Sequence, residues 1–369
     1  MKCFIVVGEQ SADNHAAEVV KQLQLLDNNL EVRAWGGDSL RSAGVQLLRH
    51  INAYSSMGFW EVFKQVFQFK KLIRECYLDI LDFNPDVVLL LDFGGFNLRI
   101  ARLVKGDGKK VIYYIPPKIW AWGAWRAKKL KKYTDYILVT LPFEPKYFDK
   151  LGIYSTYVGN PVADQIRNYL SDSKETESRN NSRERTIVVL PGSRNQEVAH
   201  VLPFIRELVL LNPDLNFFIS KSSVVDSAEF AAFNDLLNVE LFEGCIYKMV
   251  RDAHVAITTS GTATLEVALL GIPQIVVYKT SNITYQIAKR LAKINFISLV
   301  NLIAGKKIVT ELIQTELSVV NLNNEMHLLM SDSNEQKKIS EGYSEILKLL
   351  GNKSAARNVA QKIYALGRS

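Results

Sequence analysis

Short apolar runs that alternate with helical stretches constrain the fold of this chain more than any other feature. Each run is long enough for one strand and ends in polar or glycine-containing turn residues. Such runs are typical of a parallel sheet whose two faces are both covered by helices. The runs that we interpret as strands are Cys3–Val7, Val87–Leu91, Val111–Ile115, Tyr136–Val139, Thr186–Leu190, Asn216–Ile219, Val239–Phe242, Val255–Thr258 and Gln274–Val277.

A polar stretch divides this pattern into two halves. Residues 171–185 contain no large apolar side chain, which is typical of a linker or an exposed loop. The sequence therefore predicts an α/β protein with two doubly wound, Rossmann-like domains that face each other across a cleft. The predicted parts are a first domain over 1–170, a linker over 171–185, a second domain over 186–345 and a final helix over 346–369.

Charge and cysteine content narrow the class of protein. The formal net charge of +7 favours anionic partners such as nucleotides, phosphorylated substrates or an anionic membrane surface. The three cysteines, Cys3, Cys76 and Cys245, are scattered, so we expect neither a disulfide scaffold nor a metal site. We also expect no signal peptide, no membrane-spanning segment and a cytoplasmic location.

Two turns in the second half have the chemistry of a phosphate site. Ser193 and Arg194 follow a predicted strand and offer backbone N–H groups and a bidentate cation. Ser260, Gly261 and Thr262 follow another and open a helix whose free N–H groups suit a diphosphate. One helical turn later, the carboxylate of Glu266 is placed to accept hydrogen bonds from ribose hydroxyls. An ordinary connecting turn and an ordinary helix cap are the alternatives. The chain has no Walker A motif and no G-x-G-x-x-G fingerprint.

Carboxylates follow two predicted strands of the first half. Glu9, Ser11 and Asp13 lie in the first strand-to-helix turn, and Asp92 follows the strand Val87–Leu91. Each of the three carboxylates is a candidate general base, and we prefer Asp13 because of its position. Capping of the first helix by Ser11 or Asp13 is the alternative.

Aromatic side chains in the first half exceed what one core face requires. The helix predicted over 59–83 has one stripe for the core and a second that contains Trp60, Phe63 and Phe67. This second stripe either packs on another helix or dips into a membrane interface. Trp120 and Trp122 stand beside a lysine-rich run, which favours anionic lipid. We do not expect nucleic acid, since no recognition motif accompanies the basic run.

Taken together, these motifs resemble the lipid-A-disaccharide synthase family of GT-B-type inverting glycosyltransferases. The resemblance covers nearly the whole chain, and it depends on the order and spacing of motifs that are individually weak. The motifs are Gly8–Asp13, Gly36-Gly37, Met57-Gly58, Glu61-Val62, Phe96-Asn97, Trp120-Ala121-Trp122, Leu141–Glu144, Pro191–Arg194 with Glu197, Ser260–Thr262 with Glu266, and Asn301-Leu302 with Ala304-Gly305.

The resemblance implies a reaction and its partners. UDP-2,3-diacylglucosamine would donate its sugar to 2,3-diacylglucosamine 1-phosphate (lipid X), giving a β-1,6-linked disaccharide phosphate and UDP. It implies that neither a metal nor a cofactor is needed, so that Arg194 and the 260–262 turn neutralise the leaving diphosphate. Glu266 and Asn301 are expected in the donor site, with Glu9 and Ser11 near the reacting sugars.

The resemblance also implies a location. The enzyme would sit peripherally on the cytoplasmic face of the inner membrane. Its final helices would cross back toward the first domain or engage a second subunit in a homodimer.

This sequence departs from the family pattern at two positions. Many members have Asp in place of Gly95, so that either Asp92 or the first turn must supply the base. Ala12 replaces the usual glycine of that turn. The remaining alternatives are the peptidoglycan N-acetylglucosaminyltransferase, a UDP-sugar 2-epimerase, and a protein that only binds a nucleotide sugar or a lipid.

Overall fold

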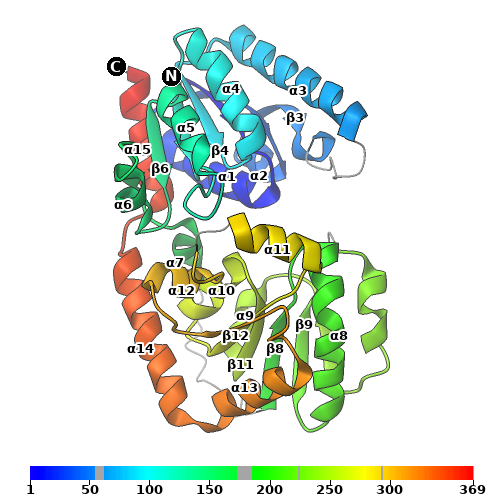
Figure 1. Ribbon diagram of the computed structural model, residues 1–369. Coiled ribbons are helices and arrows are strands. Elements are labelled where there is room, and N and C mark those ends of the chain that lie inside the picture. Colours follow the sequence, from blue (N-terminus) through cyan, green and yellow to red (C-terminus); the bar gives the residue numbers. More distant parts are fainter. Residues whose placement is uncertain (55–61, 173–184, 223–224, 292–293, 369) are drawn as a thin grey trace. The chain divides into compact units, whose positions relative to one another are not determined.

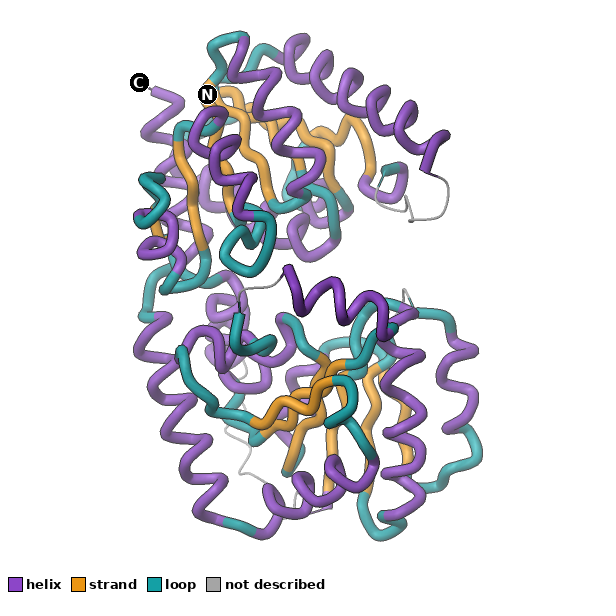
Figure 2. Tube along the Cα trace, in the orientation of Figure 1, coloured by secondary structure: helices purple, strands orange, loops and turns teal. Residues whose placement is uncertain are grey.

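A computed structural model describes residues 1–54, 62–172, 185–222, 225–291 and 294–368, with only the backbone described at 62–66 and 287–288. The chain forms two compact units. Unit 1 comprises Met1–Pro161 and Asn352–Ser369, and unit 2 comprises Val162–Gly351. Figure 1 shows the elements of each unit, and Figure 2 shows strands enclosed by helices in both. We describe each unit by itself.

Unit 1 is built on a seven-stranded parallel sheet. The strand order is β3-β2-β1-β4-β5-β6-β7. The central strands β1 and β4 are almost entirely buried, which explains their apolar sequences. The strands are β1 (Lys2–Val6), β2 (Glu31–Gly36), β3 (Gln46–His50), β4 (Val87–Leu91), β5 (Lys110–Tyr114), β6 (Tyr136–Val139) and β7 (Thr156–Tyr157).

Helices cover this sheet on both faces. In α3, the predicted core stripe is confirmed where side chains are described: Ile73 and Ile80 are buried, and Phe69 packs against the core. The principal helices are α1 (Gln10–Leu26), α2 (Asp38–Ser42), α3 (Val62–Phe83), α4 (Gly94–Gly106), α5 (Ala127–Tyr133), α6 (Glu144–Asp149) and α15 (Ala355–Arg368).

Unit 2 repeats the topology with six parallel strands in the order β10-β9-β8-β11-β12-β13. The strands are β8 (Thr186–Leu190), β9 (Asn216–Ser220), β10 (Val239–Phe242), β11 (Val255–Thr259), β12 (Gln274–Tyr278) and β13 (Thr310–Ile313). The helices are α7 (Pro161–Asp172), α8 (Asn195–Leu211), α9 (Ile246–Asp252), α10 (Thr262–Leu269), α11 (Asn282–Leu291), α12 (Leu299–Ala304), α13 (Val319–Ser331) and α14 (Ser333–Leu350).

The unit boundaries differ from the predicted domain boundaries. The first boundary falls at Pro161, not at residue 170, because α7 packs into the core of unit 2 through Ile166. The chain returns to unit 1 at Asn352, where α15 packs on α1. There Lys110 Nζ donates to the carbonyl oxygen of Leu366 at 2.9 Å. The sequence left open whether a final helix over 346–369 returns to the first domain or engages a second subunit, and the structure places residues 352–369 in unit 1.

Candidate active site

Both sheets have the strand order of a doubly wound fold, and each has one point at which the order reverses. In unit 1 the chain leaves β1 toward β2 and leaves β4 toward β5, so the reversal lies between β1 and β4. In unit 2 it lies between β8 and β11. Ligands of such sheets bind beyond the carboxyl ends of the strands at these points. The candidate residues near 9, 92, 193 and 260 follow these four strands.

Glu9 and Asp92 come together at the reversal point of unit 1. The two carboxyl groups lie close enough to share a hydrogen bond when one of them is protonated, and Ser11 Oγ donates to Oε1 of Glu9 at 2.9 Å. Burial, followed by the charge of Glu9, raises the pKa of Asp92 from 3.8 to about 6, while Lys118 opposes this shift. A carboxyl group with that pKa is ionised at neutral pH and basic enough to accept a proton.

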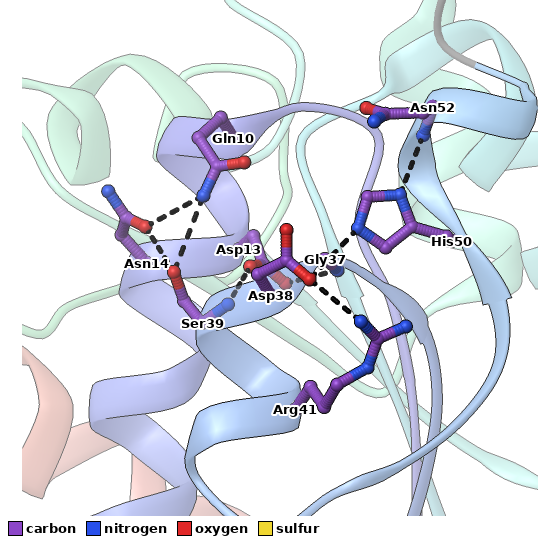
Figure 3. A network of polar contacts seen from close by, with 9 residues as sticks. All are labelled: Gln10, Asp13, Asn14, Gly37, Asp38, Ser39, Arg41, His50 and Asn52. Carbon is purple, nitrogen blue, oxygen red and sulfur yellow. Dashed lines mark hydrogen bonds and ion pairs between the residues drawn. The ribbon is translucent and has the colours of Figure 1, made fainter.

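Asp13, our preferred base, has a different role in the structure. Its side chain is fully buried, and its two oxygens accept the backbone N–H groups of Gly37 at 2.6 Å and Ser39 at 2.8 Å. Figure 3 shows these bonds together with the polar contacts of Gln10 and Asn14. The carboxylate therefore caps α2 from α1 and has no free oxygen for a substrate, which corrects the sequence-based prediction.

In unit 2, the turn after β8 presents Ser193 and Arg194 to solvent. Gly192 has φ +114°, a conformation that favours glycine. Arg194 is exposed, and its Nη1 pairs with Oε1 of Glu197 at 2.9 Å. This pairing orients the guanidinium at the start of α8 without burying it.

The turn after β11 has the predicted form. Ser260, Gly261 and Thr262 lead into α10, and no heavy atom lies within 4 Å of a Cβ built on Gly261. A side chain at position 261 would therefore meet open space. Burial raises the pKa of Glu266, and Tyr247 donates to Oε1 of Glu266 at 3.3 Å. The sequence did not point to Tyr247, because it lies in α9, away from every turn motif.

Asn301 also departs from its predicted role as a donor ligand. It is fully buried. Its Nδ2 donates to the carbonyl oxygen of Val309 and to the carboxylate of Glu311, and its Oδ1 accepts from the N–H groups of Ile308 and Val309. Glu311 also accepts from the N–H of Ser298 at 3.0 Å. The Asn301 side chain therefore holds the backbone at 308–309 and the carboxylate of Glu311, which in turn holds the turn at 297–298.

Of the predicted lipid contacts, Trp120 is contradicted. It is 8% exposed, and its Nε1 donates to the buried carboxylate of Glu144 at 2.9 Å. Trp122 and Phe67 are exposed, at 51% and 75%. Trp60 and the side chain of Phe63 lie outside the described residues. No helix in the described part of the chain is long and apolar enough to cross a membrane.

Trp122 belongs to an aromatic–basic patch that also contains Trp125, Arg126 and Lys129, and both tryptophans of the patch are exposed. The Arg126 guanidinium lies 4.2 Å from the ring centroid of Trp122 and 5.3 Å from that of Trp125. Lys129 Nζ lies 5.0 Å from the Trp125 ring. The lysine-rich run had drawn attention to this segment, but only the structure distinguishes the buried tryptophan from the exposed ones.

Comparison with known proteins decides between the families that share this fold. A sequence model described as lipid-A-disaccharide synthetase matches residues 3–364. The chain belongs to the lipid-A-disaccharide synthase family. The synthase of Trichlorobacter lovleyi is 33% identical, over 99% of this chain and 97% of its own length. Lipid-A-disaccharide synthase 1 of Legionella pneumophila (Philadelphia 1) is 33% identical, over 96% and 94%.

Solved structures agree on the fold of this synthase family member. The UDP-GlcNAc 2-epimerase from Neisseria meningitidis, bound to UDP-GlcNAc, has a TM-score of 0.68 at 15% identity, covering 99% of this chain and 100% of the epimerase. The calicheamicin glycosyltransferase CalG4 has a TM-score of 0.60 at 14% identity, covering 99% and 97%. The GT-B-type fold and the glycosyltransferase class predicted from the sequence are confirmed.

Proposed function

We propose that this chain transfers 2,3-diacylglucosamine from its UDP derivative to the 6-hydroxyl of 2,3-diacylglucosamine 1-phosphate. The products are the β-1,6-linked disaccharide 1-phosphate and UDP. Membership of the synthase family supports the pair of substrates. One observation supports the roles given to single residues. The carboxyl groups of Glu9 and Asp92 lie at the reversal point of the first sheet, and the two candidate phosphate turns lie at that of the second.

Unit 2 would bind the donor. The diphosphate would bind the N–H groups at the start of α10, at Gly261 and Thr262, with Ser193 and Ser260 in the turns after β8 and β11. Arg194 would neutralise the charge that develops on the leaving diphosphate. Glu266, held by Tyr247, would accept hydrogen bonds from the ribose hydroxyls.

Unit 1 would supply the base. The acceptor hydroxyl oxygen forms a bond to the anomeric carbon while the bond from that carbon to the diphosphate oxygen breaks. UDP leaves with the electron pair, and the hydroxyl proton passes to Asp92. Glu9 is the second carboxylate of the pair, and its charge keeps Asp92 basic. Asp92 replaces Asp13 in this scheme because both carboxylate oxygens of Asp13 accept backbone N–H groups and its side chain is fully buried.

We propose that the exposed aromatic side chains hold the enzyme at an anionic membrane surface. Phe67 and the aromatic–basic patch combine apolar area with cations, which suits acidic head groups. Both substrates are lipids, so the cytoplasmic face of the inner membrane is the location that fits them. A homodimer stays a proposal that solution mass measurement can test.

The discriminating experiment measures UDP release from the diacylated donor, with and without the phosphorylated lipid acceptor. We expect release that depends on the acceptor, together with formation of the disaccharide phosphate. Release without acceptor would indicate an epimerase or a hydrolase. Binding of the donor with no release at all would indicate a binding protein. Either result would overturn the proposed function.

A further inference from the structure

The backbone that carries Asp92 adopts an unusual conformation. Asp92 and Phe93 are both left-handed, with φ values of +46° and +45°. Residues with a side chain rarely adopt this region, and two in succession persist only where the surroundings impose it. This turn links β4 to α4 at the reversal point of unit 1.

Two buried side chains hold the carbonyl group of Asp92. Tyr113 Oη donates to this oxygen at 2.6 Å, and Asn97 Nδ2 donates to it at 3.1 Å. Both residues are fully buried. Asn97 also donates to the carbonyl oxygen of Leu91 at 3.0 Å, so it secures the end of the strand as well. Burial and the nearby Asp92 raise the pKa of Tyr113, which keeps its hydroxyl protonated and therefore a donor.

The ring of Phe93 fixes the other half of the turn. It stacks on Phe96 with 5.0 Å between the ring centroids. A Cβ at Gly8 would lie 2.3 Å from the Phe93 ring, so that only glycine fits there. With the ring and the carbonyl group both held, the Asp92 carboxyl group lies beside that of Glu9, close enough for a hydrogen bond when one of the two is protonated.

From this geometry we propose that Tyr113 is a positioning residue for the transfer reaction: its hydroxyl holds Asp92 in the left-handed conformation that brings the two carboxyl groups together. Tyr113 lies under the turn and does not itself touch the substrate. The inference rests on the proposed function, because it assumes that Asp92 accepts the proton. The charged groups that act on Asp92 are Glu9 and Lys118, and Arg126 acts on Tyr113.

The test removes one oxygen atom by Tyr113→Phe. We expect kcat to fall by about 10- to 100-fold, since a misplacement near 1 Å has effects of that size, while KM for the donor stays within about twofold. The acid limb of the kcat profile should move to lower pH, because Asp92 turns away from Glu9 and becomes more acidic. Tyr343→Phe is the matched control: Tyr343 is buried in unit 2, and its hydroxyl donates to the carbonyl oxygen of Ile272 at 3.0 Å.

A second readout separates this inference from the proposed function. Aspartate labelled with ¹³C at the carboxyl group, assigned with Asp92→Asn, reports the titration of Asp92 without any substrate. We expect its midpoint near 6 in the natural chain and clearly lower in Tyr113→Phe. An unchanged midpoint, or equal losses of kcat in Tyr113→Phe and Tyr343→Phe, would overturn the positioning role. If the natural chain is inactive but the Asp92 midpoint is lower in Tyr113→Phe, the proposed function is refuted and the positioning role of Tyr113 stands.

Discussion

The guanidinium group of Arg194 and the carboxylate of Glu197 form an ion pair, with 2.9 Å between Nη1 and Oε1, at the exposed start of α8. Because exposed ion pairs contribute only about 0–1 kcal/mol, this pair orients the arginine more than it stabilises the fold. Arg194→Ala should therefore leave the melting temperature nearly unchanged. It should lower kcat/KM by about 100-fold or more, the usual effect of losing one donor to developing charge.

The matched control for Arg194 is Arg206→Ala. Arg206 lies in α8, the helix that Arg194 precedes, and pairs with Asp235 at 3.2 Å, away from the turn after β8. Its replacement should leave UDP release unchanged. Near-normal turnover in Arg194→Ala would remove this arginine from the donor site.

Asp13 is predicted to matter for stability more than for chemistry. Asp13→Ala deprives the backbone N–H groups of Gly37 and Ser39 of a buried, charged acceptor. Hydrogen bonds to charged groups contribute about 1.5–3 kcal/mol each, so we expect a loss of about 3 kcal/mol or more in the free energy of unfolding. Urea denaturation measures this loss. Asp38→Asn is the control, because Asp38 is an exposed partner of Arg41. A fully stable but inactive Asp13→Ala would return Asp13 to the catalytic candidates.

Asp92→Asn should abolish acceptor-dependent UDP release and yet stabilise the protein at neutral pH. The folded-state pKa of Asp92 lies near 6, above its usual value of 3.8, so the folded chain binds this proton more tightly than the unfolded chain does. The stability contributed by Asp92 is therefore present below about pH 4 and declines as the pH rises toward 6. The melting temperature of Asp92→Asn relative to the natural chain should increase across this window. A variant that melts lower at pH 7.5 would contradict the placement of Asp92 beside Glu9.

The sequence predicted the central strands and the edge strand β10, and it missed β2, β3, β7 and β13. Val87–Leu91 is buried along its whole length, so its residues are uniformly apolar. In contrast, β3 is an edge strand with partly exposed positions, and residues such as Gln46 and Arg49 break up its apolar pattern. The same reason applies to β13, whose Glu311 braces a neighbouring turn. The strand β2, next to β3, was missed because its first half is polar.

The sequence predicted which turns carry the candidate site residues, but it did not predict the role of each residue. Turn residues after parallel strands could be found from the sequence, because topology alone places them at one edge of a sheet. A carboxylate or amide in such a turn faces either a ligand or the main chain, and residue type does not distinguish these directions. Asp13 and Asn301 both serve the main chain. The closeness of the Glu9 and Asp92 carboxyl groups could not be found without coordinates, since the two residues lie far apart in the sequence.

The two neighbouring tryptophans should differ in what their replacement changes. Trp122→Ser and Phe67→Ser should reduce binding to anionic vesicles several-fold with little change in stability, because both side chains are exposed. Trp120→Phe should instead destabilise the fold by about 1–3 kcal/mol, because the buried carboxylate of Glu144 loses a donor. Leu237→Ser is the control, since Leu237 is exposed but lies in unit 2. Vesicle flotation measures the binding, and equal effects of Trp122→Ser and Leu237→Ser would refute the membrane contact.

Gly95 offers a test of how this chain manages without the aspartate that many family members have at this position. No heavy atom lies within 4 Å of a Cβ built on Gly95, in the first turn of α4, so an aspartate fits there. A carboxylate near a helix N-terminus is favourable by about 0.3–1 kcal/mol, and loss of a helical glycine adds a similar amount. We expect Gly95→Asp to melt higher, and the double variant with Asp92→Asn to regain part of the lost turnover. Gly106→Asp is the matched control, because Gly106 has equal room but ends the same helix, where a carboxylate is unfavourable. Recovery with Gly95→Asp and not with Gly106→Asp would show that either position can carry the base. A double variant as inactive as Asp92→Asn would mean that this chain depends on the pairing of Asp92 with Glu9.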